Sequence, residues 1–352
     1  MIDQKIDNFI KNGNQSDFDF KSIKYKNKKI LVTGAAGSIG YGLCRYISKI
    51  NPKLLIAIDC GETELFYSQL ELKDEYPRNK IVFKILDIKD EVGVESILKE
   101  YQPDIIFHAA AYKHISMLEE NPREAILNNI LGTKNLIESA NKLRIPKFIN
   151  ISTDKAANPI SVMGCSKRVI EKMLISGNYN NTKIIQVRFG NIIGSRGSVL
   201  PIFQQQILKG GPLTITDDRM VRYFITVDEA VYLLLHASKI GENKQIYLLE
   251  MGEPVKIIDL ADKLIRAYGF TPGKNFRVSI TGKKPGEKYF EELYCKKSEV
   301  IGKTPIDKIN VVKNVSKIPT SFQDKVNNLI KYCQKNTSTD QIRKKLFKLA
   351  KD

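Results

Sequence analysis

The sequence predicts an α/β fold, a Rossmann-type doubly wound parallel sheet with a smaller C-terminal lobe. Three observations predict it. Short apolar runs typical of buried strands alternate with helical stretches over roughly the first 190 residues. The first of these runs ends in a glycine-rich turn that opens a helix. After residue 190 the alternation gives way to a segment in which glycine and proline are frequent.

The runs that we expect to form strands are short and apolar on both faces. They lie at residues 30–32, 54–58, 81–85, 105–107, 148–151 and 184–187. Helical stretches separate most of them, among them residues 38–50, 92–101 and 123–143. Because right-handed crossovers place helices on both faces of a parallel sheet, this alternation predicts the doubly wound arrangement.

Three parts of the chain are expected from this pattern. Residues 1–28 are polar and rich in lysine, asparagine and aspartate, which is typical of a loosely packed arm. Residues 29–190 would form the nucleotide-binding domain, and residues 191–352 a smaller substrate-binding lobe interleaved with it. The elements expected in this second part are helices near 227–239 and 257–268, a strand near 245–249, and a basic helical tail after residue 324.

The overall composition is that of a globular protein. Of the 352 residues, 42% are hydrophobic and 27% are charged, values that argue against a disordered chain. No stretch reaches the roughly 18 to 20 apolar residues of a membrane helix, and the N-terminus lacks the apolar run of a signal peptide. We therefore expect a cytoplasmic protein without membrane contact.

The cysteines and the net charge narrow the possible partners. None of the five cysteines belongs to a C-x-x-C pair, so we expect reduced thiols, no disulfide framework and no metal site. The net charge of +17 suits either nucleic-acid binding or the handling of anionic small molecules. Because the basic residues are mostly lysines spread along the chain, the small-molecule interpretation is favoured.

A cradle for phosphate follows the first predicted strand. Residues 33–40 read TGAAGSIG, and such glycines let backbone N–H groups approach a pyrophosphate at the positive end of a helix. The spacing is G-x-x-G-x-x-G instead of the usual G-x-G-x-x-G. The candidate cofactor contacts here are Gly34, Gly37, Ser38, Ile39 and Gly40.

Acidic and small residues at the next strand ends extend this candidate cofactor site. Asp59 ends the second strand about 20 residues after the last glycine, where a carboxylate accepts ribose hydroxyls and repels a 2′-phosphate. This favours NAD over NADP, although Asp59 could instead cap its loop. Asp87 and Ile88 follow the third strand and could meet the adenine. After the fourth strand, residues 109–111 are alanines (Ala109, Ala110 and Ala111), which suit either a flat cofactor or tight helix packing.

Polar residues also end the fifth predicted strand. Thr153, Asp154 and Lys155 follow residues 148–151, at the edge of the sheet where ligands bind in doubly wound folds. Three adjacent functional groups at this point are hard to explain by packing alone. The sequence therefore predicts a catalytic site here.

At this point the chain resembles the nucleotide-sugar 4,6-dehydratases of the polysaccharide-biosynthesis (CapD-like) family, within the extended short-chain dehydrogenases/reductases. Many members carry membrane helices before this domain, and the chain resembles a soluble version. The matching segments cover about residues 29–300 and read VTGAAGSIG, LDIKD, IIFHAAAYKHISMLEENP, NNILGT, ISTDKAANPISVMGCSKR, VRFGNIIGSRGSVLPIFQQQI, GGPLTITDDRMVRYFIT and KKPGEKYFEELY.

The resemblance implies a function for several residues. The family's Tyr-x-x-x-Lys pair stands here as Met163 and Lys167, similar to a subgroup that acts on UDP-N-acetylglucosamine. A thioether has no proton to exchange, so Met163 cannot be an acid or base at C4 of the sugar. Hydride would leave C4 for NAD, water would be lost across C5 and C6, and hydride would return to C6.

The implied roles follow this reaction. Asp154 would act as the acid and Lys155 as the C5 base, while Thr153 would bond the C4 hydroxyl. Lys167 would hold the nicotinamide ribose, and Asn129 of NNILGT would be a further cofactor contact. Retention of the C5 configuration is favoured over inversion.

A sugar diphosphate needs cations and N–H donors. The candidate substrate contacts are Lys113, His114, Arg188, Asn191, Arg196, Ser198, Arg222, Lys284 and Glu287. Any of these charges could instead be only solvated, and His114 could be structural. Lys284 replaces an arginine of the family motif and loses its bidentate geometry.

Two other functions stay open at this stage. A nucleotide-sugar 4-epimerase shares the fold and NAD but needs no acid/base pair for elimination, so Asp154 and Lys155 argue against it. A non-catalytic NAD- or nucleic-acid-binding protein would not need the Thr-Asp-Lys group. By analogy with the family we also expect a homo-oligomer, a dimer or larger, that pairs through the helices following the fourth and fifth strands.

Overall fold

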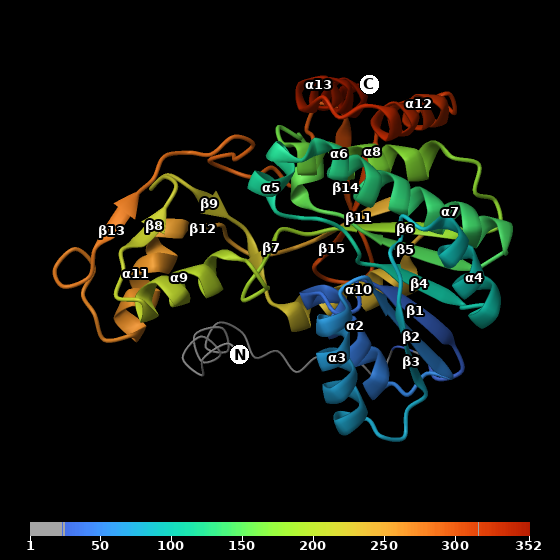
Figure 1. Cartoon of the computed structure of the whole chain (residues 1–352), viewed down its shortest axis with the longest axis horizontal. Helices are drawn as coiled ribbons and strands as arrows, with labels where there is room; N and C mark the ends of the chain where they lie inside the picture. Colours follow the sequence, from blue (N-terminus) through green and yellow to red (C-terminus); the bar gives the residue numbers. More distant parts are fainter. Residues whose placement is uncertain (1–22, 24, 316) are drawn as a thin grey trace.

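A mostly parallel sheet forms the centre of the molecule (Figure 1). The computed structural model describes residues 23, 25–315 and 317–352, so most of the expected arm at residues 1–28 lies outside the described residues. Within the described part, nine strands pair in the order β14-β15-β11-β6-β5-β4-β1-β2-β3. The strands from β11 to β3 are parallel, and β14 and β15 are antiparallel additions at one edge. The predicted fold class is confirmed.

The strand bounds agree closely with the predicted apolar runs. They are β1 (Lys29–Thr33), β2 (Leu54–Asp59), β3 (Ile81–Ile85), β4 (Ile105–His108), β5 (Lys147–Ile151), β6 (Lys183–Arg188), β11 (Gln245–Leu249), β14 (Glu299–Lys303) and β15 (Ile309–Asn314). The parallel ladders bring the carboxyl ends of β1, β2, β4 and β5 to one edge of the sheet. Most of the cofactor and catalytic candidates follow these strand ends, while Asp87 and Ile88 follow β3, which pairs in parallel with β2.

Helices cover both faces of this sheet. Alternate residues of β1 point to opposite sides, so Leu31 joins one apolar core while Ile30 and Val32 join the other. One face carries α2 (Ser38–Lys49), α3 (Glu62–Glu75) and α10 (Val227–Ile240). The opposite face carries α4 (Glu91–Tyr101), α7 (Gly132–Lys142) and α8 (Val162–Ser176). This two-sided burial explains why the strands are apolar on both faces.

The connection from β4 to β5 differs from the single helix expected at residues 123–143. It consists of α5 (Ile115–Glu120), α6 (Pro122–Glu124), the π-helical segment η2 (Ala125–Leu131) and α7. A π-helical turn is wider than an α-helical one and often occurs at functional sites. Here it carries Asn128 and Asn129, both buried.

A smaller lobe stands beside the sheet (Figure 1). Its apolar core contains Leu200, Phe203, Leu213, Leu260 and Leu264. Its elements are β7 (Asn191–Ile192), α9 (Val199–Leu208), β8 (Leu213–Ile215), β9 (Val221–Arg222), β10 (Phe224–Ile225), β12 (Val255–Lys256), α11 (Ile257–Ala267) and β13 (Val278–Ile280). Between and after them the chain returns to the large sheet as α10, β11, β14 and β15, so the two parts are interleaved.

The C-terminal tail forms two helices, α12 (Phe322–Lys335) and α13 (Thr339–Lys351), that pack on α8 and η2. It is not a purely solvated basic face, because Val326, Leu329, Ile342 and Leu346 are buried in the main core. Burial of such side chains contributes about 1.5–3 kcal/mol each. Lys172 of α8 also donates from Nζ to the Ala350 carbonyl at 3.0 Å. A second copy of the chain that approached α8, the helix after the fifth strand, would therefore meet the hairpin formed by α12 and α13.

None of the helices in the described ranges combines the length and the apolar character needed to cross a membrane.

Candidate functional site

The glycine turn after β1 is closed so tightly that two of its positions exclude any side chain. Gly34 has φ +65°, and a Cβ there would lie 2.7 Å from the Ala110 backbone nitrogen. A Cβ on Gly40 would lie 1.9 Å from the Gly34 carbonyl oxygen. The turn therefore brings β1, the first turn of α2 and the segment after β4 into backbone contact.

We expect Gly40→Ala to destabilise the protein by about 1–3 kcal/mol, because the turn must move to admit the methyl group. Gly37→Ala is the matched control, since its Cβ would meet the same carbonyl oxygen at 3.2 Å, a contact that a small shift relieves. Urea unfolding curves of both variants provide the measurement. Wild-type stability in Gly40→Ala would contradict this account of the turn.

A cleft lies beside this turn, at the carboxyl ends of the strands. It is lined by Gly34, Gly37, Ile58, Asp59, Cys60, Leu86, Asp87, Ile88, Ala109, Ala110, Ala111, Tyr112 and Asn128. Eight of the predicted cofactor contacts therefore meet in one cleft. The other five lining residues were not predicted as cofactor contacts: Ile58, Cys60, Leu86, Tyr112 and Asn128. Ser38, Ile39 and Gly40 instead form the first turn of α2.

The contacts of Asp59 bear on both roles considered from the sequence, the loop cap and the acceptor for ribose hydroxyls. Its Oδ2 accepts a hydrogen bond from the Ala36 N–H at 3.0 Å, and its Oδ1 accepts one from the Gly61 N–H at 2.9 Å. The carboxylate thus caps its own loop and stiffens the glycine turn. It also lines the cleft, and each oxygen keeps a further lone pair for a ligand hydroxyl.

Asn129 does not line the cleft, although it was predicted as a cofactor contact. Its Nδ2 donates to the Tyr112 carbonyl at 3.0 Å and to Ser166 Oγ at 3.1 Å, and its Oδ1 accepts from the Tyr112 N–H at 2.8 Å. The fully buried side chain therefore holds the backbone of Tyr112, while its neighbour Asn128 faces the cleft.

His108 at the end of β4 is a structural residue beneath the cleft. Thr133 donates its hydroxyl proton to the Asn129 carbonyl at 2.6 Å, so it accepts from Nε2 of His108 at 2.8 Å. Nδ1 then accepts from Thr33 Oγ1 at 2.7 Å. Burial, followed by the charge of Lys167, lowers the pKa of His108 to about 3. A neutral imidazole therefore joins β1, β4 and the start of α7.

The predicted catalytic residues gather at the end of β5, where Asp154 opens the short 3-10 turn η3 (Asp154–Ala156). Oδ1 of Asp154 accepts from Thr153 Oγ1 at 2.8 Å and from Lys155 Nζ at 3.0 Å. Lys155 Nζ also donates to Oδ1 of Asn191 at 2.9 Å. Asp154 is fully buried, and its Oδ2 has no hydrogen-bond partner among the described residues. One carboxylate oxygen is thus buried and unpaired.

Met163 and Lys167 lie in the first two turns of α8, which begins at the N-cap Ser161. Met163 is buried in the main apolar core, where it cannot exchange protons. Lys167 donates from Nζ to the Ile151 carbonyl, at the end of β5, at 2.9 Å. Burial lowers the pKa of Lys167 to about 8, against the opposing effect of Glu171. Its amine is therefore tied to the strand end that carries the catalytic residues.

The loop after β7 lies against the cofactor turn. The Arg196 N–H donates to Ser38 Oγ at 3.1 Å, and Lys113 Nζ lies 3.5 Å from Ser195 Oγ. A Cβ on Gly197 would lie 2.5 Å from the ring of His114, so this loop packs on the segment after β4. Partial desolvation, then the charge of Arg196, lowers the pKa of Lys113. Burial, then Lys113, lowers that of His114.

Ser198 is the N-cap residue of α9, and its Oγ is buried without a hydrogen-bond partner among the described residues. It stands two residues after Arg196, in the same loop. Four predicted substrate contacts, Lys113, His114, Arg196 and Ser198, thus lie on this loop or against it, while Asn191 contacts Lys155.

The prediction that Arg188 contacts a diphosphate is wrong. Arg188 is fully buried, and its guanidinium pairs with Glu171 at 2.6 Å and Glu299 at 2.8 Å. Two carboxylates compensate its charge in the interior, so none of it reaches a ligand. The sequence could not reveal this, because Glu299 lies 111 positions away along the chain.

Arg222 is also buried, but it faces the catalytic cluster from the smaller lobe. Its Nη1 donates to the carbonyls of Val221 at 2.8 Å and Tyr289 at 3.3 Å. Its Nε lies 3.7 Å from Oε1 of Glu291, a buried carboxylate that was not predicted. That same Oε1 lies 3.6 Å from Lys155 Nζ. The Glu291 carboxylate therefore lies between Arg222 and Lys155.

Lys284 and Glu287 lie in a separate exposed turn. The Lys284 N–H donates to Oε2 of Glu287 at 2.9 Å, so the carboxylate caps its own turn. Gly286 between them packs closely on the body of the molecule, because a Cβ there would lie 2.8 Å from Oε1 of Glu119 and 2.9 Å from Ser161. The turn thus approaches the start of α8 without contacting the catalytic cluster.

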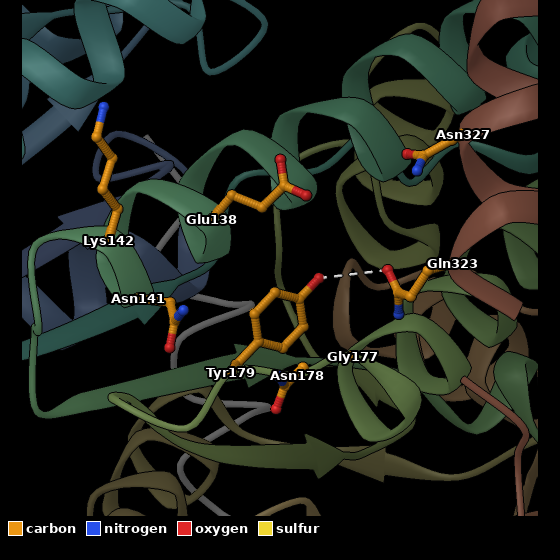
Figure 2. Close-up of a pocket in the computed structure, with 8 residues that line it drawn as sticks. All are labelled: Glu138, Asn141, Lys142, Gly177, Asn178, Tyr179, Gln323 and Asn327. Atoms are coloured by element: carbon orange, nitrogen blue, oxygen red, sulfur yellow. Dashed lines mark hydrogen bonds between the residues drawn. The ribbon is translucent and has the colours of Figure 1, made fainter. Parts of the chain in front are cut away.

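A second pocket lies at the opposite end of the strands, where α7 and α8 end and α12 docks (Figure 2). It is lined by Glu138, Asn141, Lys142, Gly177, Asn178, Tyr179, Gln323 and Asn327. Gln323 donates from Nε2 to the Met173 carbonyl at 2.6 Å, and Tyr179 reaches its Oε1 at 3.5 Å. This pocket is the joint of the C-terminal hairpin, away from the strand ends where ligands bind in this fold. Across the described ranges, no three His, Cys, Asp or Glu side chains converge as metal ligands would.

Comparison with known proteins identifies the family of the chain. A family model described as polysaccharide biosynthesis protein matches residues 30–314. The chain belongs to this family. Two relatives are 45% identical to it: the "Probable polysaccharide biosynthesis protein EpsC" of Bacillus subtilis and the capsular polysaccharide biosynthesis protein CapD of Staphylococcus aureus. The matches cover 84% and 80% of this chain but 49% and 47% of those proteins, so the chain spans about half their length.

Other members and neighbours include named enzymes. A UDP-glucose 4-epimerase of Rickettsia canadensis is 34% identical over 76% of this chain and 78% of its own. Among solved structures, Pen from Bacillus thuringiensis is 31% identical, with a TM-score of 0.76 over 84% of this chain and 90% of its own. The dTDP-glucose 4,6-dehydratase DesIV from Streptomyces venezuelae, at 20% identity and a TM-score of 0.66 over 76% of this chain and 89% of its own, shares the fold.

Proposed function

We propose that the chain is an NAD-dependent 4,6-dehydratase that converts UDP-N-acetylglucosamine to a UDP-4-keto-6-deoxy-N-acetylhexosamine, with retention at C5. The observation that carries this proposal is the hydrogen-bonded group of Thr153, Asp154 and Lys155 at the end of β5, with Asp154 fully buried. An acid and a base side by side at this edge of the sheet suit the loss of water from a sugar. The family relatives named for polysaccharide biosynthesis support a glycan precursor as substrate.

The cleft beside the glycine turn has the features that NAD needs. The glycine turn beside it leads into α2, whose N-terminal turn offers backbone N–H groups to a pyrophosphate, and Asp59 offers acceptors to a ribose and repels a 2′-phosphate. Lys167 and Thr153 follow at the end of β5, toward which the nicotinamide end would extend. When bound there, NAD supplies a reversible hydride acceptor for the sugar, so that no net oxidant is consumed.

The side chains account for the proton transfers at C5 and C6. Once C4 is a ketone, the C5 proton is acidic, and Lys155 as a neutral amine removes it. The C5–H electron pair forms the new C5–C6 double bond while Asp154 protonates the departing C6 hydroxyl as water. The Asp154 side chain is fully buried, and its Oδ2 has no hydrogen-bond partner among the described residues. Thr153, bonded to Asp154, stands where it would hold the C4 hydroxyl in place of a tyrosine.

A nucleotide-sugar 4-epimerase is the second candidate, and the Rickettsia relative named UDP-glucose 4-epimerase favours it. Epimerisation moves hydride to and from C4 alone and needs no proton transfer at C5 or C6. The pairing of Asp154 with Lys155 has no role in that chemistry, which is why dehydration is preferred.

Mass spectrometry of purified protein incubated with UDP-N-acetylglucosamine separates the candidates. We expect a product that has lost one water. A product of unchanged mass but altered C4 configuration would favour the epimerase, and unchanged substrate would favour a non-catalytic protein. Proton NMR of the product formed in deuterated water gives the C5 configuration, for which we expect retention.

A further inference from the structure

The buried carboxylate of Glu291 stands out because the proposed mechanism leaves it without a role. Its side chain is 2% exposed, and its Oε2 has no hydrogen-bond partner among the described residues. Buried polar atoms are almost always paired, so an unpaired carboxylate oxygen calls for an explanation. Oδ2 of Asp154 is another buried carboxylate oxygen in this state. Both flank Lys155.

Glu291 approaches Lys155 from a different part of the chain. Its Oε1 lies 3.6 Å from Nζ of Lys155 and 3.7 Å from Nε of Arg222. Both distances exceed a good hydrogen bond, so the carboxylate is close to two cations without being bonded to either. Arg222 is itself fixed by backbone carbonyls of Val221 and Tyr289. The Glu291 carboxylate therefore lies between Lys155 and an arginine that is itself held in place.

The proposed reaction creates a need that this carboxylate can meet. Lys155 contacts Asp154 at 3.0 Å and Asn191 at 2.9 Å, both through acceptor oxygens, which are the partners of an ammonium group. A C5 base must be a neutral amine, so the ammonium must first lose a proton. Asp154 cannot take it and also bring its own proton to the C6 hydroxyl. Glu291 is the other carboxylate within reach in the described site.

We infer that Glu291 is a positioning residue that acts through Lys155, as the acceptor of the lysine proton before the C5 step. This inference rests on the proposed dehydratase function. One Nζ–H bond of Lys155 breaks and an O–H bond forms on Glu291, while the N–H electron pair stays on nitrogen. The amine then takes the C5 proton. After water has left, the lysine returns its proton to carbon and Glu291 returns its own to the amine, so both groups regain their starting states.

Glu291→Gln tests this role, because glutamine keeps the size of the side chain but cannot accept the proton. We expect the rate of water loss from UDP-N-acetylglucosamine to fall on the order of 10²-fold at neutral pH. The loss should shrink as pH rises, because solvent then removes the lysine proton. Glu291→Asp keeps the acid and should recover part of the rate. Glu292→Gln is the matched control: its residue is adjacent, half exposed and paired with Lys288, and its rate should stay at the wild-type value.

The outcomes separate this inference from the function on which it rests. A Glu291→Gln rate equal to wild type, or a loss of the same factor at every pH, would overturn the role of Glu291 while the dehydratase stands. If wild-type protein removes no water from the sugar, the proposed function itself fails. Thermal unfolding and calorimetric measurement of UDP binding are recorded for each variant, so that a misfolded protein is recognised. If Glu291→Gln does not fold, the rate of Glu291→Asp decides whether Glu291 has this role.

Discussion

Lys155→Ala is expected to lower the rate of water loss from UDP-N-acetylglucosamine on the order of 10³-fold, within the range that a general base contributes. The side chain is the amine closest to Asp154 in the proposed mechanism, at 3.0 Å. Its removal takes away the C5 base and leaves Asp154 and Glu291 buried without their shared cation. Mass spectrometry of the product over time measures the effect.

Lys155→Arg tests the function of Lys155 as a base separately from its positive charge. A guanidinium keeps the positive charge between the two carboxylates but does not give up its proton in proteins. We therefore expect this variant to be nearly as slow as Lys155→Ala, yet to oxidise C4 and accumulate reduced cofactor, seen by its near-ultraviolet absorbance. Lys142→Ala, at an exposed pair with Glu95, should leave the rate unchanged. Rapid water loss by the arginine variant would exclude Lys155 as the base.

The sheet could be predicted from sequence because each of its signals is local. A run that is apolar on both faces, followed by a polar or glycine residue, marks the end of a parallel strand, and β1 to β6 end within a residue or two of the predicted bounds. Helix α3 shows the limit of this reasoning. It buries Leu65 and Leu72 but exposes Phe66, Tyr67 and Leu70, so no apolar stripe marks it in the sequence.

The residues of the candidate site were predictable when they follow a strand end. Asp59 and the alanines after β4 line the cleft because parallel strands bring their carboxyl ends to one edge. Residues from the second part of the chain were harder to interpret. Glu291 approaches Lys155 only because the segment after β13 packs beside β9, a contact that no local pattern reveals. Asn129, in the π-helical segment η2, bonds the backbone of Tyr112 and is not among the residues that line the cleft.

Arg188→Met is expected to destabilise the protein by about 3–5 kcal/mol, because it removes one member of a buried charged group. Arg188 and Arg168 share the carboxylates of Glu171 and Glu299, and Glu171 also accepts from Ser152 Oγ at 2.7 Å, beside the catalytic residues. Methionine leaves Arg168 as the remaining cation beside the carboxylates of Glu171 and Glu299. Arg219→Met is the control, because Arg219 pairs with Asp217 on the surface and its loss should change little.

The pH dependence of the stability lost in Arg188→Met tests the same buried group in a second way. Burial alone would raise the pKa of Glu299, but its hydrogen bonds and ion pairs with arginines outweigh burial and lower it from 4.5 to about 2. A carboxyl whose pKa is lowered on folding stabilises the protein above its ordinary pKa and loses that contribution as pH falls toward the folded value. The stability difference between wild type and Arg188→Met should therefore narrow from about pH 4.5 down to about pH 2. Urea unfolding at several pH values measures it, and a difference that grows on acidification would contradict the ionised Glu299 on which this account of the buried group depends.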